Sequence, residues 1–596
     1  MTSSGAQSTL SPAPLVCVID HLHRDMQIAG DAVEGRFTHA GSTVALGRRP
    51  DWISQIGHDK EWRIEWVKLY EGLDLAHAFA TTGDREYLTA WEDLVEEFCD
   101  QVAVGHDTSD VSARRLQNWI YAWQRFAAAP AYRELRHGLA ERIVDRIAAD
   151  ALHLAVNLTP GRNHRTMELY ALVIVTMAFP HNDPGGERLR GAIEELDRNL
   201  RTDIWDDGVH RECSSDYHMI VLRSFLGTIA NAQKLGVALP DGFVERVGLA
   251  CDFALHVQRP DGTTPSFSDG DEGDYRRLLA LGADLLGRDD LRWAATGGTA
   301  GRPPAGRNVA FPVGGYAVQR SGWGDRERAY VDERFCLFDV GPLGDGGHGH
   351  YDQLSVEIAA DGATLIIDPG RYTYTDEDGQ WRHYFKGTAA HNTVMIDGLD
   401  QTPYRRSAPK QPSVATLLAR SSVDGLDVVV GEVRSVVHDA VHVRDLAFVA
   451  DDFWIVVDHL RSEQPHRYEA RWHLAAGAAG QTTLVVDAGG GGGVTAPGLT
   501  MVVARGAASV SIEDGWVSPV YGVKLPAPVV VAAVVGHADA DIVTLIVPGR
   551  RAASVVTEVV DLNGWRGRAT IAGIAHEIRW RRDGSGGLAV VVEVAA

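Results

Sequence analysis

The sequence has few cysteines and no dense cysteine motif. Its five cysteines are an odd number, lie far apart among 596 residues and form no CxxC pair. Neither a disulfide framework nor a thiolate zinc site is indicated, because both need paired cysteines at short spacings. We expect buried free thiols at Cys17, Cys99, Cys213, Cys251 and Cys336.

Long apolar runs are also absent. No segment reaches the roughly 18 uninterrupted apolar residues of a membrane span. The segment from Met1 to Met26 lacks the basic stretch and apolar run of an export signal. We expect no membrane association and, for the sequence as written, a cytoplasmic protein. A secreted protein given without its leader would have the same pattern.

Basic charge is in deficit, with 57 Lys and Arg against 80 Asp and Glu and a formal net charge of −23. Nucleic-acid binding gains from counterion release at a basic surface, so a DNA- or RNA-binding protein is disfavoured. The same net charge repels acidic polysaccharides at long range. A site for such a polyanion would need its own cluster of Arg, Lys and His.

The length predicts two or more packed domains, and 45% hydrophobic with 23% charged residues is a globular composition. From about Trp52 to about Thr296 the apolar residues recur every three or four positions, which predicts amphipathic helices. Around ten helices in antiparallel pairs favour a bundle or an α/α toroid. The clearest are Trp62 to Ala76, Tyr87 to Phe98, Leu116 to Phe126, Ala140 to Leu158, Leu169 to Ala178, Ala192 to Leu200, Met219 to Leu235 and Phe243 to Val257.

Beyond Gly301–Pro304 the apolar period changes to two, which predicts an antiparallel β-sandwich with a smaller β layer after Gly493. We place the domains at residues 1–305 and 306–596. The glycine run Gly489–Gly493 precedes strand-like sequence, so we interpret it as a flexible loop and not as a phosphate-binding loop. Strands are expected at Thr364–Ile367, Asp427–Val430, Phe453–Val457, Tyr468–Leu474 and Thr544–Val547.

Two polar runs precede predicted helices. Arg162-Asn163-His164-Arg165 places an amide, an imidazole and two guanidiniums at a helix entrance, which suits a carboxylate. The structural alternative is a polar loop with Asn163 as the helix cap. Asp207–His218 is dense in acids, bases and hydroxyls, as functional loops are, but ordinary capping sequences share this composition.

A third run lies among the predicted strands. His350 and His391 with Asp368 offer two imidazoles and one carboxylate, a common ligand set for zinc that leaves a position for water. The alternative is that the histidines join strands by hydrogen bonds. No HExxH helix is present to decide between them.

Together the three runs resemble the heparinase II/III-like polysaccharide lyases. The resemblance is carried by NHRTMELYAL from Asn163, DGVHRECSSDYH from Asp207, and HGHYDQLSVEI, DPGRYTY and HYFKGTAAHNTVMIDG between His348 and Gly398. It implies an incomplete (α/α) toroid followed by an antiparallel β-sandwich, with a cleft between them. It also implies cleavage of a uronate glycan by β-elimination, which leaves an unsaturated uronate.

The resemblance implies roles for single residues. Asn163 contacts the uronate carboxylate beside His164, Tyr217 transfers protons, and His348 faces the cleft. A structural zinc is held by His350, Asp368 and His391, and no organic cofactor is implied. β-Elimination needs these residue types, because donors must stabilise charge on the carboxylate while a base takes the C5 proton and an acid protonates O4.

We predict Tyr217 as the acid, with its phenol influenced by the helix start and by Arg211. The base would be His164 or a deprotonated tyrosine, and the second tyrosine would be Tyr372 or Tyr384. The residues expected to bind substrate, including the basic set that the net charge requires, are Arg162, Arg165, Arg211, Glu212, Arg371, Tyr372, Arg382, Tyr384 and Lys386.

Two other functions fit the same residues. A zinc-dependent glycan hydrolase would use His350, Asp368 and His391 to activate water. A noncatalytic protein would bind an acidic glycan in the same cleft without turnover. In each case the expected partner is an acidic polysaccharide or oligosaccharide, and assembly into homo-oligomers is a further expectation.

Overall fold

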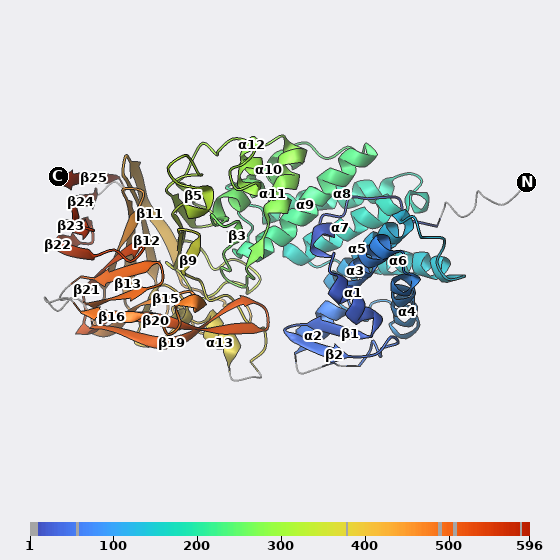
Figure 1. Ribbon diagram of the computed structural model, residues 1–596, viewed down its shortest axis with the longest axis horizontal. Helices are drawn as coiled ribbons and strands as arrows, with labels where there is room; N and C mark the ends of the chain where they lie inside the picture. Colours follow the sequence, from blue (N-terminus) through green and yellow to red (C-terminus); the bar gives the residue numbers. More distant parts are fainter. Residues whose placement is uncertain are drawn as a thin grey trace, which may run out of the picture. The chain divides into compact units, whose positions relative to one another are not determined.

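The computed structural model forms two compact units, Met1–Asp203 with Ile220–Val247, and Ile204–Met219 with Gly248–Ala596. The chain passes between the units after Asp203, within α9 (Ser215–Leu235) and within α10 (Phe243–Val257). Figure 1 labels the helices and strands along the chain. The structure describes residues 10–54, 56, 59–376, 380–486, 492–504, 509–583 and 587–595.

The first unit is helical. Helices α1, α3, α5 and α7 contact one another in that order, and α4, α6 and α8 pack beside them. This alternation of helices is the layered arrangement expected of an (α/α) toroid. The bounds are α1 (Met26–Val33), β1 (Arg36–His39), β2 (Ser42–Ala45), α2 (Lys60–Trp66), α3 (Glu71–Thr82), α4 (Arg85–Gln101), α5 (Ser109–Ala128), α6 (Leu139–Val156), α7 (Arg162–Ala178) and α8 (Glu187–Asp203).

Local sequence sets the turn between α3 and α4 as predicted. Gly83 ends α3 in the left-handed conformation with φ of 74°. The Asp84 side chain then caps α4 by accepting a hydrogen bond from the Glu86 amide. The single helix expected from Trp62 to Ala76 is wrong, because Leu69 adopts a φ of 56° and separates α2 from α3.

The second unit contains α11 (Arg276–Leu286), α12 (Asp289–Ala295), α13 (Trp381–Lys386) and the antiparallel strands. A five-stranded sheet has the order β5-β6-β7-β8-β9, and a short pair is β3-β4. These strands are β3 (Thr263–Thr264), β4 (Gly273–Asp274), β5 (Val309–Phe311), β6 (Tyr316–Arg320), β7 (Phe335–Asp339), β8 (Val356–Ala360) and β9 (Ala363–Ile366).

An eight-stranded sheet has the order β11-β12-β13-β14-β21-β18-β17-β16, and a four-stranded sheet has the order β10-β15-β20-β19. Their bounds are β10 (Val394–Ile396), β11 (Val414–Val423), β12 (Leu426–Arg434), β13 (Val441–Val449), β14 (Phe453–Arg461), β15 (His466–His473), β16 (Thr483–Val486), β17 (Gly492–Ala496), β18 (Leu499–Val503), β19 (Ser509–Val520), β20 (Val523–His537) and β21 (Ala540–Pro548).

A last four-stranded sheet consists of β22 (Ala553–Asp561), β23 (Gly564–Ile571), β24 (Ile574–Arg582) and β25 (Leu588–Ala595). It covers one face of the eight-stranded sheet through Val428, Ile455, Trp565 and Trp580. The opposite face packs on the five-stranded sheet through residues such as Val429, Trp454, Phe338 and Val356. The two faces alternate along each strand, as the period of two predicts.

The predicted fold class, a helical region followed by an antiparallel β region, is therefore confirmed. The smaller layer was expected after Gly493, whereas the terminal sheet begins at Ala553 and β17 and β18 belong to the eight-stranded sheet. Gly492 and Gly493 lie in β17, so the loop predicted for them is wrong, and Gly489–Gly491 lie outside the described residues. The change from mainly helices to mainly strands lies between α12 and β5, near the predicted domain boundary at residue 305. The two compact units divide at other positions, after Asp203, Met219 and Val247, so that boundary stays a prediction.

All five cysteines are free thiols, and Cys213, Cys251 and Cys336 are buried as predicted. Cys17 and Cys99 are partly exposed. Over the described parts of the chain, no helix combines the length and the hydrophobicity needed to cross a membrane.

We expect His459 to make the stability of the protein depend on pH. Its Nδ1 lies 2.8 Å from Asp541 Oδ1, and its Nε2 lies 3.5 Å from Asp445 Oδ2. Burial opposes protonation, but these two carboxylates raise the pKa of His459 from 6.5 to about 9. The stabilisation is complete below about pH 6.5 and is lost as the pH rises through about 9. We expect this residue to remove about 3 kcal/mol from the free energy of unfolding over that range.

Urea unfolding of the native protein and of His459→Gln at several pH values measures this effect. The variant should show a flatter dependence between pH 6.5 and 9. Equal slopes for both proteins would contradict the prediction.

Candidate functional site

Tyr217 lies in the first turn of α9, in the second unit. Its hydroxyl oxygen lies 2.7 Å from that of Tyr374, which follows β9. Its ring stacks on the imidazole of His348, with centroids 3.9 Å apart and planes at 29°. All three residues are partly exposed.

Arg371 contacts the tyrosine pair through Tyr374. Its guanidinium donates to the Tyr374 oxygen and, through Nε and Nη2, to the two oxygens of Asp271 at 3.0 and 2.8 Å. Burial raises the pKa of Tyr217 well above its ordinary value, Tyr374 adds to the increase, and Arg371 opposes it. Tyr217 is therefore protonated at neutral pH, which suits a proton donor.

This geometry corrects the cation predicted for Tyr217. Arg211 donates from Nε to Asp345 Oδ2 at 2.6 Å. The positive charge of Arg371 lowers the pKa of Tyr217, and those of Arg371 and Arg382 lower the pKa of Tyr374, in each case against the larger effect of burial. The neighbouring Glu212 is buried.

Asp269 joins both histidines of the HGH run and is 1% exposed. Its Oδ2 lies 3.0 Å from His348 Nδ1, and its Oδ1 lies 2.9 Å from His350 Nε2. Arg382 donates to both carboxylate oxygens. Although burial opposes ionisation, Arg382 and the two histidines hold the pKa of Asp269 well below its ordinary value.

An ionised carboxylate only accepts hydrogen bonds, so both histidines donate to Asp269. The His348 Nδ1–H is thereby fixed toward the protein, and its Nε2 carries the lone pair. Asp269 lies in the acidic run from Asp269 to Asp274, between α10 and α11, which the sequence reasoning did not single out. The density of carboxylates there was the signal that could have found it.

The predicted metal ligands come together. One ligand atom each from His350, Asp368 and His391 lies within 4.8 Å of the others, and all three residues are buried. Among the residues that the structure describes, His350 Nδ1 has no hydrogen-bond partner, and His391 Nδ1 lies 3.0 Å from Asp368 Oδ2. The Nε2 atoms are bonded elsewhere, to Asp269 and to the Phe385 carbonyl oxygen at 3.1 Å.

These residues fit a metal ion. Each imidazole is oriented through Nε2–H by an oxygen acceptor, as ligating histidines are, so Nδ1 is the nitrogen that could bind a metal. Burial lowers the pKa of His350 to about 4, which keeps it in the neutral form that binds metals. The group could hold a metal.

The tyrosine whose hydroxyl contacts that of Tyr217 is Tyr374, whereas Tyr372 or Tyr384 was expected in that place. Tyr372 packs on Trp381 and Phe385, with the Lys524 ammonium over its ring. The Tyr384 hydroxyl accepts a hydrogen bond from the Trp516 amide at 3.0 Å. Tyr374 ends the DPGRYTY run, so the signal was present two residues beyond Tyr372. Substrate binding by Tyr372 and Tyr384 stays a prediction.

The cluster expected to bind carboxylate begins α7 in the first unit, after Gly161 as N-cap. Asn163 lies in the first turn and is buried, while Arg162 and His164 are partly exposed. Arg165 pairs with Glu195 at 3.0 Å. Asn163 is thus inside the helix and is not its cap. Its role toward a carboxylate, and those of its neighbours, stay predictions.

The predicted basic residues of the second unit are held by protein acceptors. Arg371 pairs with Asp271 and Arg382 with Asp269, while Lys386 donates to the Gly347 carbonyl oxygen at 2.7 Å. Burial lowers the pKa of Lys386 to about 8. An anionic ligand at Tyr217 would therefore meet hydroxyl and imidazole groups before any unpaired cation.

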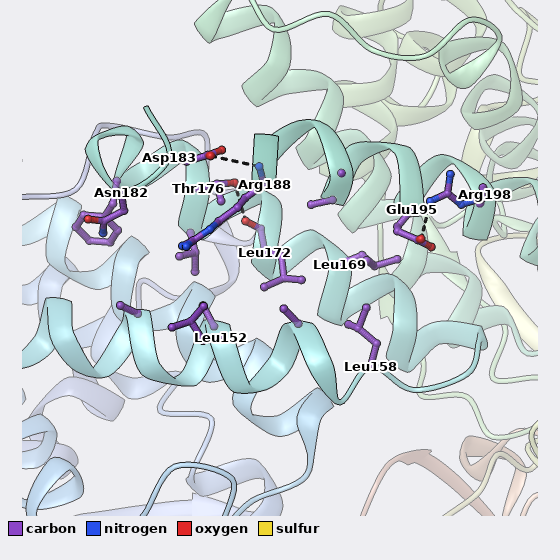
Figure 2. Close-up of a pocket in the computed structure, with 17 residues that line it drawn as sticks. Leu152, Leu158, Leu169, Leu172, Thr176, Asn182, Asp183, Arg188, Glu195 and Arg198 are labelled. Carbon is purple, nitrogen blue, oxygen red and sulfur yellow. Dashed lines mark hydrogen bonds and ion pairs between the residues drawn. The ribbon is translucent and has the colours of Figure 1, made fainter. Parts of the chain in front are cut away.

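A separate hollow of about 400 Å³ lies among α6, α7 and α8 in the first unit (Figure 2). Leu152, Leu158, Leu169 and Leu172 make it largely aliphatic, and the charged side chains of Arg188, Glu195 and Arg198 lie along its margin. None of the predicted catalytic residues lines it, so it is distinct from the candidate site.

Comparison with known proteins places this geometry in a family. The sequence model of the family described as heparinase II/III N-terminus matches residues 19–285. The family model described as heparinase II/III-like, C-terminal, matches residues 303–559. A heparin-sulfate lyase of Bacteroides stercoris is 22% identical over 445 residues, which are 72% of this chain and 63% of that protein. One of Pedobacter heparinus is 21% identical over 487 residues, 78% of this chain and 70% of that protein.

The fold comparison agrees. A crystal structure of heparinase III has a TM-score of 0.78 at 16% sequence identity, and the alignment covers 98% of this chain and 93% of that one. At this identity the likeness shows the fold. The chain spans less than two thirds of the Bacteroides stercoris relative. The two family models match in the predicted order, one on the helical region and one on the strands, and the chain belongs to the heparinase II/III-like family.

Proposed function

We propose that this protein is a polysaccharide lyase that cleaves a uronic-acid-containing glycan by β-elimination. The observation that carries the proposal is the protonated Tyr217 hydroxyl beside an imidazole whose tautomer is fixed by Asp269. The heparin-sulfate lyases to which the chain is similar support the class of reaction. The assay described below, with several uronate glycans, identifies which one is the substrate.

In this mechanism Tyr217 gives its proton to the O4 leaving group. Tyr374 lies within hydrogen-bond distance of Tyr217, so it can stabilise the phenolate that forms, and Arg371 supplies positive charge through Tyr374. The His348 Nε2 lone pair is a candidate to take the C5 proton. The competing bases are His164 and a deprotonated tyrosine, which the resemblance to the family implies.

The test is incubation with uronate polymers and oligomers, followed by ultraviolet absorbance and mass spectrometry of the products. A lyase yields a C4–C5 double bond conjugated to the carboxylate, with no added water. A glycan hydrolase yields products heavier by one water and without that absorbance. Saturated products would overturn the proposal in favour of the hydrolase, and binding without turnover would favour a noncatalytic protein.

We further propose that the metal held by His350, Asp368 and His391 is zinc, because two imidazoles and a carboxylate suit it. When bound, it would supply a fixed positive charge that ties three segments of the β region together. We expect about one zinc per chain by elemental analysis. His350→Ala should lose the metal and lower the melting temperature, because a metal bound only by the folded state adds its binding energy to stability.

His442→Ala is the matched control, because His442 is also a buried histidine bonded to a carboxylate, Asp458, at 2.7 Å. It should keep its zinc. Metal-free native protein whose stability does not change on adding zinc would contradict the zinc assignment. Chelation that abolishes turnover while fold and substrate binding persist would instead support the hydrolase.

A further inference from the structure

Three arginines share the solvent face of the terminal sheet β22–β25. Arg579 and Arg581 on β24 are exposed, whereas Trp580 between them is 2% exposed, so the two arginines point to the same face. Arg566 on β23 lies directly opposite Arg579 in the register and is also exposed. The strands therefore gather three guanidiniums on one surface.

The arginines line a hollow of about 420 Å³. Gly564 on β23 and Ala589 on β25 lie on either side of Arg581 in the register. The single methyl group of Ala589 leaves space beside that arginine, whereas a Cβ at Gly564 would meet the backbone of Trp580 and Arg581. Val559 and Val591 also line the hollow, so aliphatic surface lies beside the guanidiniums.

The charges of this hollow are only partly balanced. Like charges directly opposite each other on neighbouring strands are unfavourable, as at Arg566 and Arg579. Arg566 pairs with Glu558 at 2.8 Å, and Asp561 is a carboxylate among the lining residues. Within the described ranges, no carboxylate pairs with Arg579 or Arg581, whereas Arg568 nearby pairs with Glu577. Excess positive charge thus collects here in a chain of net charge −23.

We propose that this hollow binds an acidic sugar unit of a polysaccharide, outside the site at Tyr217. The inference rests on the proposed function for the class of ligand. A uronate ring presents an apolar C–H face and an anionic group, which match the aliphatic surface and the guanidiniums. A nucleic acid would need a continuous basic surface, which the acidic chain does not favour.

The experiment compares Arg579→Gln/Arg581→Gln with the control Arg568→Gln, each in the Tyr217→Phe background so that the probe is not consumed. The probes are heparin and alginate, with binding measured at low and moderate NaCl. We expect the double substitution to raise the dissociation constant for at least one polymer about tenfold and to weaken its salt dependence, because two charge-assisted hydrogen bonds are lost. The control should bind like its parent.

Equal binding by the double variant and the control overturns the proposal, as does failure of the parent to bind either polymer. Circular dichroism and the melting temperature of both variants verify the fold. A loss of affinity in the double variant supports polysaccharide binding in the hollow, whether or not the native protein forms unsaturated product. If affinity is lost and no unsaturated product forms, only the proposed lyase function fails.

Discussion

Replacing Tyr217 with phenylalanine is expected to lower the formation of unsaturated product by about a hundredfold to ten-thousandfold, the usual contribution of a positioned proton donor. The substitution removes one hydroxyl and keeps the ring that stacks on His348. Substrate affinity should change little, because the loss falls on the transition state and not on ground-state contacts. The measurement is the initial rate of absorbance increase on a glycan that the native enzyme cleaves.

Tyr468→Phe is the matched control. Its hydroxyl lies 2.8 Å from both Ser462 Oγ and the Ala538 carbonyl oxygen, and its ring belongs to a separate core cluster. The control should retain turnover. Near-native turnover in Tyr217→Phe would show that another group protonates O4, and Tyr374 would be the first to test.

The fold could be predicted from the sequence because burial leaves a periodic trace. Apolar residues repeat with the helical period in α4, whereas β14 begins with a continuous apolar run and is buried on both faces. The break at Leu69 could not be predicted, because a positive φ at a leucine leaves no compositional signal. Gly492 and Gly493 were misassigned because glycine normally weakens a strand.

The site was predictable only where chemistry and local sequence coincide. The ligand set of His350, Asp368 and His391 converges as the residue types indicated. Tyr374 was not predicted as the partner of Tyr217, because only the direction of the side chains distinguishes it from Tyr372. That direction depends on the backbone, and the positive φ of 55° at Tyr372 cannot be read from the sequence. Asp269 was missed because it lies 79 residues before His348, beyond the reach of any local pattern.

Asp269→Asn is expected to lower turnover by about tenfold to a hundredfold, the usual effect of losing a group that orients an imidazole. An amide has one oxygen, which cannot accept from His348, His350 and Arg382 as the carboxylate does. The buried Arg382 guanidinium would lose its counter-charge, at a cost of about 3–5 kcal/mol of stability. Steady-state kinetics, urea unfolding and zinc content of the variant measure the three consequences.

A second substitution separates the positioning role of Asp269 from its charge balance. Asp269→Asn/Arg382→Gln removes the buried positive charge as well, so much of the lost stability should return. Turnover should stay low with a nearly unchanged KM, because the pair of amides does not restore an acceptor for both His348 and His350. If turnover recovered together with stability, Asp269 would serve only to neutralise Arg382, and the orientation of His348 would have to come from another contact.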